Sequence, residues 1–77
     1  MTGWQIEKGA LQKQFNFKDF TGAFAFMTRV APVAEKLGHH PDWTNVYNRV
    51  TVRLSTHEAG ALTDLDFQLA SKMDDAA

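Results

Sequence analysis

Three histidines are the side chains of this sequence best suited to acid–base chemistry. His39 and His40 are adjacent and precede Pro41, and His57 follows further along the chain. Imidazole titrates near neutral pH, so two histidines can divide the roles of general acid and general base. Loops held by a rigid scaffold are where such groups usually lie. These residues therefore indicate a histidine acid–base site, although their spacing does not reveal a substrate.

Other interpretations of the histidines remain open. A His-His-Pro loop can simply end a helix, with one imidazole bonded to the last carbonyl groups. A zinc site is a third interpretation, but adjacent ligands point apart and the sequence has no His-x-x-x-His spacing. Cysteine is absent, which excludes disulfides, thiolate ligands and thiol nucleophiles. We therefore expect no metal at this site.

Acidic and aromatic residues near the histidines have both functional and structural explanations. Asp66 lies three residues after Thr63, in the pattern of a helix capping box, so it explains a helix start without any catalysis. Trp43 and Tyr47 are able to stack on a flat heteroaromatic ligand, but aromatic residues in short strands more often serve packing. None of these residues identifies a function alone.

Hydrophobic periodicity predicts the elements that position these side chains. Alternation over 4–6 and 11–17 predicts a hairpin with a turn at 9–10. Asp19 as N-cap and Gly38 as C′ residue bracket a predicted helix over 20–37. Strands are predicted near 43–47 and 50–56, with a turn near 47–49, followed by a loop over 57–61. A last helix follows Thr63, with a frayed tail over 74–77. The order β-β-α-β-β-α predicts an α+β fold in two layers, a four-stranded antiparallel sheet with helices on one face.

Composition limits the function classes. The 77 residues allow one domain, spanning 1–77. Eight basic and nine acidic residues give a net charge of −1, and the basic ones are scattered, which argues against binding to nucleic acid. No apolar run is long enough for a membrane span, and the N-terminus lacks the regions of a signal peptide. We therefore expect a cytoplasmic protein.

The helix predicted over 20–37 carries two apolar stripes. One contains Phe20, Phe24, Met27, Ala31 and Ala34, and the other Phe26, Val30, Val33 and Leu37. A broad arc facing the core and an interface between subunits explain the second stripe equally well. The interface is given this equal weight because a chain of this size buries only about 60% of its unfolded surface. Pro32 predicts a kink or a break near 29–31.

The motifs resemble one known family, the pterin-4a-carbinolamine dehydratases, also called dimerisation cofactor of a homeodomain transcription factor. The resemblance covers nearly the whole chain from Gly3. The segments that carry it are Glu35–Trp43 (EKLGHHPDW), Asn45–Asn48, Leu54–Glu58 (LSTHE) and Leu62–Asp66, with Phe15–Phe20 and Ala23–Ala31 upstream.

The resemblance implies a hydro-lyase, 4a-hydroxytetrahydrobiopterin dehydratase. Its reaction converts 4a-hydroxytetrahydropterin (pterin-4a-carbinolamine) to quinonoid dihydropterin and recycles the cofactor of aromatic amino acid hydroxylases. The pterin is the substrate, and no cofactor or metal is implied. Implied partners are further copies of the chain, as homodimer or homotetramer, and an aromatic amino acid hydroxylase. The alternative function is a homo-oligomeric binding module or transcriptional coactivator acting through its helices. Animal members begin with a further helix that this sequence lacks, so we expect their subunit contacts to differ.

The resemblance also assigns roles to individual residues. His39 and His57 are the implied acid–base pair, and His40 mainly binds and orients the pterin. Pro41 and the segment Thr56, His57, Glu58 and Ala59 would line the substrate site together with His39 and His40. Asp66 and Trp43 would support the site, Asp66 by orienting a histidine, by capping its helix or by both. Which histidine donates a proton and which accepts one stays open.

Overall fold

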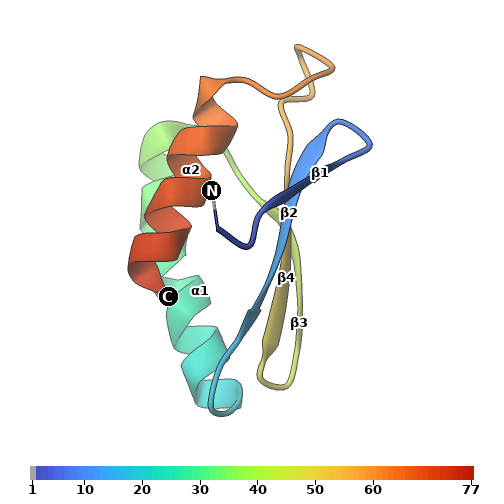
Figure 1. The fold of residues 1–77 in the computed structure, drawn as a ribbon. Helices are drawn as coiled ribbons and strands as arrows, with labels where there is room; N and C mark the ends of the chain where they lie inside the picture. Colours follow the sequence, from blue (N-terminus) through green and yellow to red (C-terminus); the bar gives the residue numbers. More distant parts are fainter. Residues whose placement is uncertain (1) are drawn as a thin grey trace.

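One antiparallel sheet carries both helices on the same face, as Figure 1 shows. This is a computed structural model, and it describes residues 2–77. The elements are β1 (Gln5–Glu7), β2 (Ala10–Asn16), α1 (Phe20–Leu37), β3 (Asp42–Val46), β4 (Arg49–Leu54) and α2 (Asp64–Ala76). The strands lie in the order β1-β2-β4-β3, and each neighbouring pair is antiparallel. The predicted fold class and element order are confirmed.

Two tight turns join the paired strands. Lys8 and Gly9 form the first turn, with φ of 51° and 75°. The turn was predicted at 9–10, but Ala10 is the first residue of β2. The turn of the second hairpin lies where the sequence predicts it. Its left-handed residue is Tyr47 (φ 52°), whereas Asn48 was the expected one. The Asn48 side-chain amide instead donates to the Phe17 carbonyl oxygen at 3.0 Å, which ties this turn to the end of β2.

The core lies between the sheet and the two helices. Its fully buried side chains include Phe26 and Val30 from α1, the alternate residues of β4, and Leu69 and Met73 from α2. Val33 and Leu37 pack against this cluster. The second stripe of α1 therefore faces the core, so of its two explanations the broad arc facing the core is the one that the structure supports. The physical reason is that α2 and the sheet together cover a wide arc of α1.

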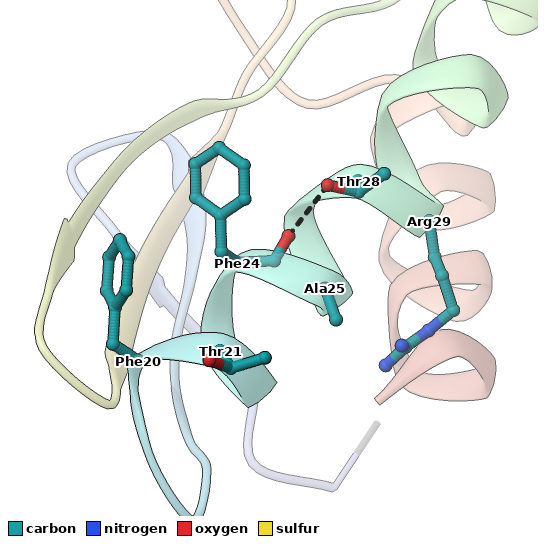
Figure 2. A pocket seen from close by; sticks show the side chains of 6 residues that line it. All are labelled: Phe20, Thr21, Phe24, Ala25, Thr28 and Arg29. Atoms are coloured by element: carbon teal, nitrogen blue, oxygen red, sulfur yellow. Dashed lines mark hydrogen bonds between the residues drawn. The ribbon is translucent and has the colours of Figure 1, made fainter.

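Exposed apolar side chains belong instead to the first stripe of α1. Phe20 and Phe24 are 51% and 54% exposed, and their ring centres lie 5.8 Å apart. Figure 2 shows the two rings side by side on one side of the helix. They border an apolar groove of about 540 Å³ that is lined by Phe20, Thr21, Phe24, Ala25, Thr28 and Arg29. The exposed apolar surface of α1 thus lies on the N-terminal half of the helix, where Phe20 and Phe24 are.

Helix α1 runs without a break through Pro32, so of the expected kink or break near 29–31 the break is wrong. It begins at Asp19, whose carboxylate accepts from the Gly22 amide at 2.8 Å. It ends at Gly38, which has a left-handed φ of 66°. Both predicted ends of this helix are confirmed. Among the helices over 2–77, none has the length and apolar character to cross a membrane.

The last turn of α2 is held in place by three contacts, and the expected fraying is wrong. The Asp74 carboxylate accepts from the Trp4 ring nitrogen at 3.1 Å and from Lys13 Nζ at 2.7 Å. The carbonyl oxygen of Ala76 accepts two bonds from the Arg29 guanidinium, at 2.7 and 3.0 Å.

Candidate active site

The C-terminal end of α1 positions two of the histidines. The Gly38 amide donates to the Glu35 carbonyl at 3.1 Å, and the His39 amide donates to the Ala34 carbonyl at 3.1 Å. This pair of bonds is a Schellman motif, which requires the left-handed residue that Gly38 supplies. The backbone direction at His39 and His40 therefore follows from how the helix ends.

A short loop after β4 positions the third histidine. Thr56 and Ala61 form an isolated bridge, and the Gly60 amide turns back to the carbonyl oxygens of Thr56 and His57 at 3.0 and 3.1 Å. Gly60 adopts a φ of 65°, which closes the loop. His57 lies at the tip of this loop, beside the end of β4. The loop, the end of α1 and the start of α2 meet at one end of the molecule (Figure 1).

One cavity of about 390 Å³ brings the three histidines together at that end. It is lined by Gly38, His39, His40, Ser55, Thr56, His57, Glu58 and Leu65. Five residues of the predicted site are among them. Pro41 and Ala59 are not part of this wall, and Trp43 packs against the core, its ring centre 6.5 Å from that of Phe26.

Three lining residues were not among the predicted site residues, namely Gly38, Ser55 and Leu65. Each is adjacent in sequence to a residue that the motifs did single out, so proximity was the available signal. Thr63 was expected only to cap a helix. Its hydroxyl lies 2.7 Å from the Thr56 hydroxyl, behind the wall of the cavity.

Asp66 is the most buried polar group of the site, with no exposed surface. Its Oδ1 lies 2.6 Å from His39 Nε2. Its Oδ2 accepts from the Thr56 hydroxyl at 2.8 Å and from the Thr63 amide at 2.9 Å. Asp66 thus caps α2, as its sequence position predicts, and holds His39 at the same time. The His39 side chain is 11% exposed.

The electrostatics of Asp66 keep it ionised at neutral pH. Burial alone would raise the pKa of this carboxyl group, because it penalises the charged form. The hydrogen bonds from the Thr63 amide, from His39 and from the Thr56 hydroxyl, together with the charge of His39, outweigh that effect. The pKa of Asp66 is therefore lowered from its ordinary value of 3.8.

The other two histidines are much more accessible. His40 Nε2 lies 2.6 Å from Glu35 Oε1, and the two side chains are 63% and 78% exposed. His57 is exposed, and within residues 2–77 no hydrogen bond involves its ring. The part of the chain that the structure describes contains no group of three or more His, Asp or Glu side chains that could hold a metal ion. The cavity thus combines one fixed imidazole with two accessible ones.

The arrangement suits proton transfer to and from a small polar molecule. A buried, oriented imidazole and an exposed imidazole border the same space, as a general acid and a general base must. The apolar groove on α1 (Figure 2) is larger, but no histidine or carboxylate lines it and it shares no lining residue with this cavity.

Comparison with known proteins agrees with this chemistry. The family model "Pterin 4 alpha carbinolamine dehydratase" matches residues 1–76. Two similar proteins are both named as pterin-4-alpha-carbinolamine dehydratases. The one from Sinorhizobium medicae is 60% identical, and the match covers 100% of this chain and 75% of that protein. The one from Synechococcus sp. is 59% identical, and the match covers 92% of this chain and 76% of that protein. The crystal structure of a transcriptional coactivator/pterin dehydratase from Brucella melitensis superposes with a TM-score of 0.97 at 49% identity, covering 99% of this chain and 83% of that one. The chain therefore belongs to the pterin-4a-carbinolamine dehydratase family.

Proposed function

We propose that the cavity at the end of α1 is where this chain carries out its reaction, with His39 and His57 as the acid–base pair. Family membership makes that reaction the dehydration of pterin-4a-carbinolamine, and the chain a hydro-lyase. The observation that carries the assignment of the site is that His39, His40 and His57 border one cavity of about 390 Å³.

The reaction requires two proton transfers and no other reagent. The bond between the ring carbon 4a and its hydroxyl breaks, and a proton delivered to that hydroxyl makes it leave as water. A second proton leaves the neighbouring ring nitrogen, whose electron pair forms the new C=N bond of the quinonoid dihydropterin. One imidazole loses a proton while the other gains one, so exchange with water resets the pair.

The remaining residues would bind the ring. His40 is held only by the exposed Glu35 contact, which leaves it able to turn toward a ligand. The Glu58 carboxylate lines the cavity and offers an acceptor for ring N–H groups. Pro41 and Ala59 lie next to lining residues in the sequence and would meet the substrate at the rim. Trp43 would act indirectly, by supporting the sheet beneath the loop.

The test is the rate at which the purified chain consumes 4a-hydroxytetrahydropterin, measured by stopped-flow absorbance. We expect His39→Gln and His57→Gln each to lose roughly 10²-fold or more in kcat. His40→Gln, the matched control at the neighbouring position, should mainly raise KM. An active wild-type chain whose His39 and His57 variants both keep full rate would refute the assignment of the site.

We also propose that the chain self-associates, as homodimer or homotetramer, through the exposed face of α1. Phe20 and Phe24 support this, because two neighbouring aromatic rings that are half exposed favour burial against a second copy of the same face (Figure 2). Light scattering of the wild type and of a Phe20→Gln/Phe24→Gln variant tests it. A wild-type chain that is monomeric at tens of micromolar would contradict it.

The alternative function remains a transcriptional coactivator that acts through its helices. The name of the Brucella melitensis structure includes that role, and it supports the alternative here. The same Phe20→Gln/Phe24→Gln variant separates the two functions, because it should abolish binding to a partner while leaving dehydration intact.

Association with an aromatic amino acid hydroxylase and a cytoplasmic location are proposed on the chemistry of the reaction and the cysteine-free sequence.

A further inference from the structure

A second hollow lies beside the cavity of the three histidines. Its volume is about 260 Å³, and it shares Ser55, Thr56 and His57 with that cavity. The two spaces therefore meet along one segment of the chain, and His57 borders both of them. The other residues that line the hollow come from the first hairpin turn, the start of β3, the end of β4 and the loop after it, namely Lys8, Gly9, Asp42, Arg53, Gly60 and Ala61.

Arg53 connects the first hairpin with the end of β4. Its side chain alternates along the strand with buried Val52 and Leu54, so it lies on the face of the sheet that the helices do not cover. Its guanidinium contacts the carbonyl oxygens of Glu7 and Lys8 at 3.4 and 3.3 Å. Figure 1 shows the turn between β1 and β2 and the loop after β4 at the same end of the molecule. The hollow is the space between this turn and that loop.

Positive charge exceeds negative charge among the residues that line the hollow. Lys8 and Arg53 are cations, and Asp42 is the carboxylate. Asp42 and Arg53 are partners in the register of β3 and β4, but no ion pair within residues 2–77 joins Asp42 to either cation. The two contacts of the guanidinium are long and use two of its five N–H groups. The hollow therefore keeps cationic donors that an anion can occupy.

The chemistry of the substrate determines where its side chain leaves the cavity. In a pterin the side chain is attached to ring carbon 6, which is bonded to the ring nitrogen that loses its proton. This nitrogen is also bonded to carbon 4a, where the hydroxyl leaves. A residue that transfers protons at either atom is therefore close to the side chain. Because His57 borders both spaces, a pterin whose reacting atoms meet His57 can extend its side chain into the hollow.

We propose that the hollow is the subsite for the side chain of the pterin, and that Lys8 and Arg53 select a side chain that ends in a phosphate. This inference rests on the proposed function of the cavity. A phosphate ester has a charge of about −1.5 to −2 at neutral pH and three acceptor oxygens, which suits two cations. The Arg53 guanidinium offers a planar fork of donors, and Lys8 offers a compact charge on a flexible stem. Asp42 can accept hydrogen bonds from hydroxyl groups along the side chain.

Calorimetric titration of the whole chain with two unreactive pterins tests the proposal. Dihydroneopterin and dihydroneopterin phosphate share the ring and the side chain and differ only in the phosphate. Neither has the hydroxyl on carbon 4a, so binding is measured without turnover. We expect the phosphate to lower Kd roughly 10-fold, as for two partly exposed charge pairs. Inorganic phosphate alone should bind more weakly than dihydroneopterin phosphate, because it lacks the contacts of the ring. Equal Kd values for the two pterins would overturn the proposal.

Variants that remove charge show where the preference arises. Lys8→Gln/Arg53→Gln should bind the two pterins with equal affinity, and Lys8→Gln alone, at an exposed turn, should lose part of the preference. Arg49→Gln/Lys72→Gln is the matched control, because it removes the same two kinds of charge at exposed residues that line neither space. If the control loses the preference as fully as Lys8→Gln/Arg53→Gln, the net charge of the chain attracts the phosphate and the subsite is wrong.

The same titration separates this inference from the proposed function. A chain that dehydrates pterin-4a-carbinolamine but binds both pterins equally well retains the proposed function and contradicts the subsite. A chain that neither dehydrates the carbinolamine nor binds either pterin overturns the proposed function and the subsite together.

Discussion

Replacing Asp66 by asparagine is the most informative single change in this molecule. The side chain keeps its size, but one of its two oxygens becomes an NH₂ group that can only donate. If the remaining oxygen accepts from the Thr56 hydroxyl and the Thr63 amide, as Oδ2 does now, the NH₂ group faces His39 Nε2. His39 must then accept at Nε2, which moves its own proton to Nδ1.

The expected effect on stability is modest. All buried partners of residue 66 keep a hydrogen bond, so the variant loses charge assistance rather than a bond. Bonds to charged groups contribute about 1.5–3 kcal/mol and neutral ones about 1 kcal/mol, so a bond that loses its charge assistance costs about 0.5–2 kcal/mol. A domain of 77 residues is stable by roughly 4–12 kcal/mol, so the variant remains folded.

The expected effect on catalysis is much larger. The changed tautomer exchanges the N–H and the lone pair of the His39 ring, so the ring presents the opposite group to the substrate. The same change in a Ser-His-Asp triad lowers kcat by about 10⁴-fold for this reason. We expect a loss of roughly 10²–10⁴-fold in kcat for Asp66→Asn, measured by stopped flow beside urea unfolding followed by circular dichroism. Asp64→Asn, the same substitution at an exposed position of the same turn, is the control.

The pH dependence of the unfolding free energy tests the same prediction independently. The pKa of Asp66 is lowered in the folded chain, so its carboxylate adds stability that is present above the unfolded pKa of about 4 and lost as the pH falls through the folded pKa. The difference in unfolding free energy between wild type and Asp66→Asn should therefore shrink as the pH falls below about 4. A folded Asp66→Asn variant with wild-type kcat, or a difference independent of pH, would refute the reasoning.

Three further changes test other parts of the structure. Gly38→Ala places a side chain at a φ of 66° and should lower the unfolding free energy measured in urea by about 1 kcal/mol. KM should rise, because His39 and His40 follow this residue directly. An unchanged KM would contradict the role given to the end of α1. Glu35→Gln weakens an exposed contact with His40 and should change the unfolding free energy by less than about 1 kcal/mol; a larger loss would show that the pair is structural. Asp74→Ala leaves the Trp4 ring nitrogen without its acceptor and should cost about 1–3 kcal/mol, detectable as a lower urea midpoint with unchanged kcat.

Much of the fold follows from local sequence signals because those signals are backbone requirements. Asp19 and Gly38 bracket α1 through a side-chain acceptor and a left-handed residue, and both are visible as letters. The two apolar stripes of α1 are different, because the sequence left the role of the second stripe open. Periodicity shows which residues share a face, but the face that α2 covers depends on tertiary packing, and here that face carries Phe26 and Val30.

The sequence motifs also named part of the candidate site. The motif positions named His39, His40, His57, Thr56 and Glu58, which the fold brings to one cavity. The resemblance allowed Asp66 to orient a histidine, to cap its helix or to do both, and one carboxylate can do both because α2 starts beside the end of α1. The contact between the Thr63 and Thr56 hydroxyls depends on the same arrangement. Contacts between segments distant in sequence need the fold first.

The Asp66–His39 contact joins residues 27 positions apart, and Thr56 joins it from a third segment. The site therefore exists only when α1, β4 and α2 have all docked. The time at which dehydratase activity reappears during refolding therefore reports when the last of these elements docks. If α2 docks last, circular dichroism and core fluorescence will recover before turnover does, and the lag between them measures the lifetime of a folded but inactive chain. Enzyme activity would then report on the assembly order of this small domain more directly than any spectroscopic signal from its core.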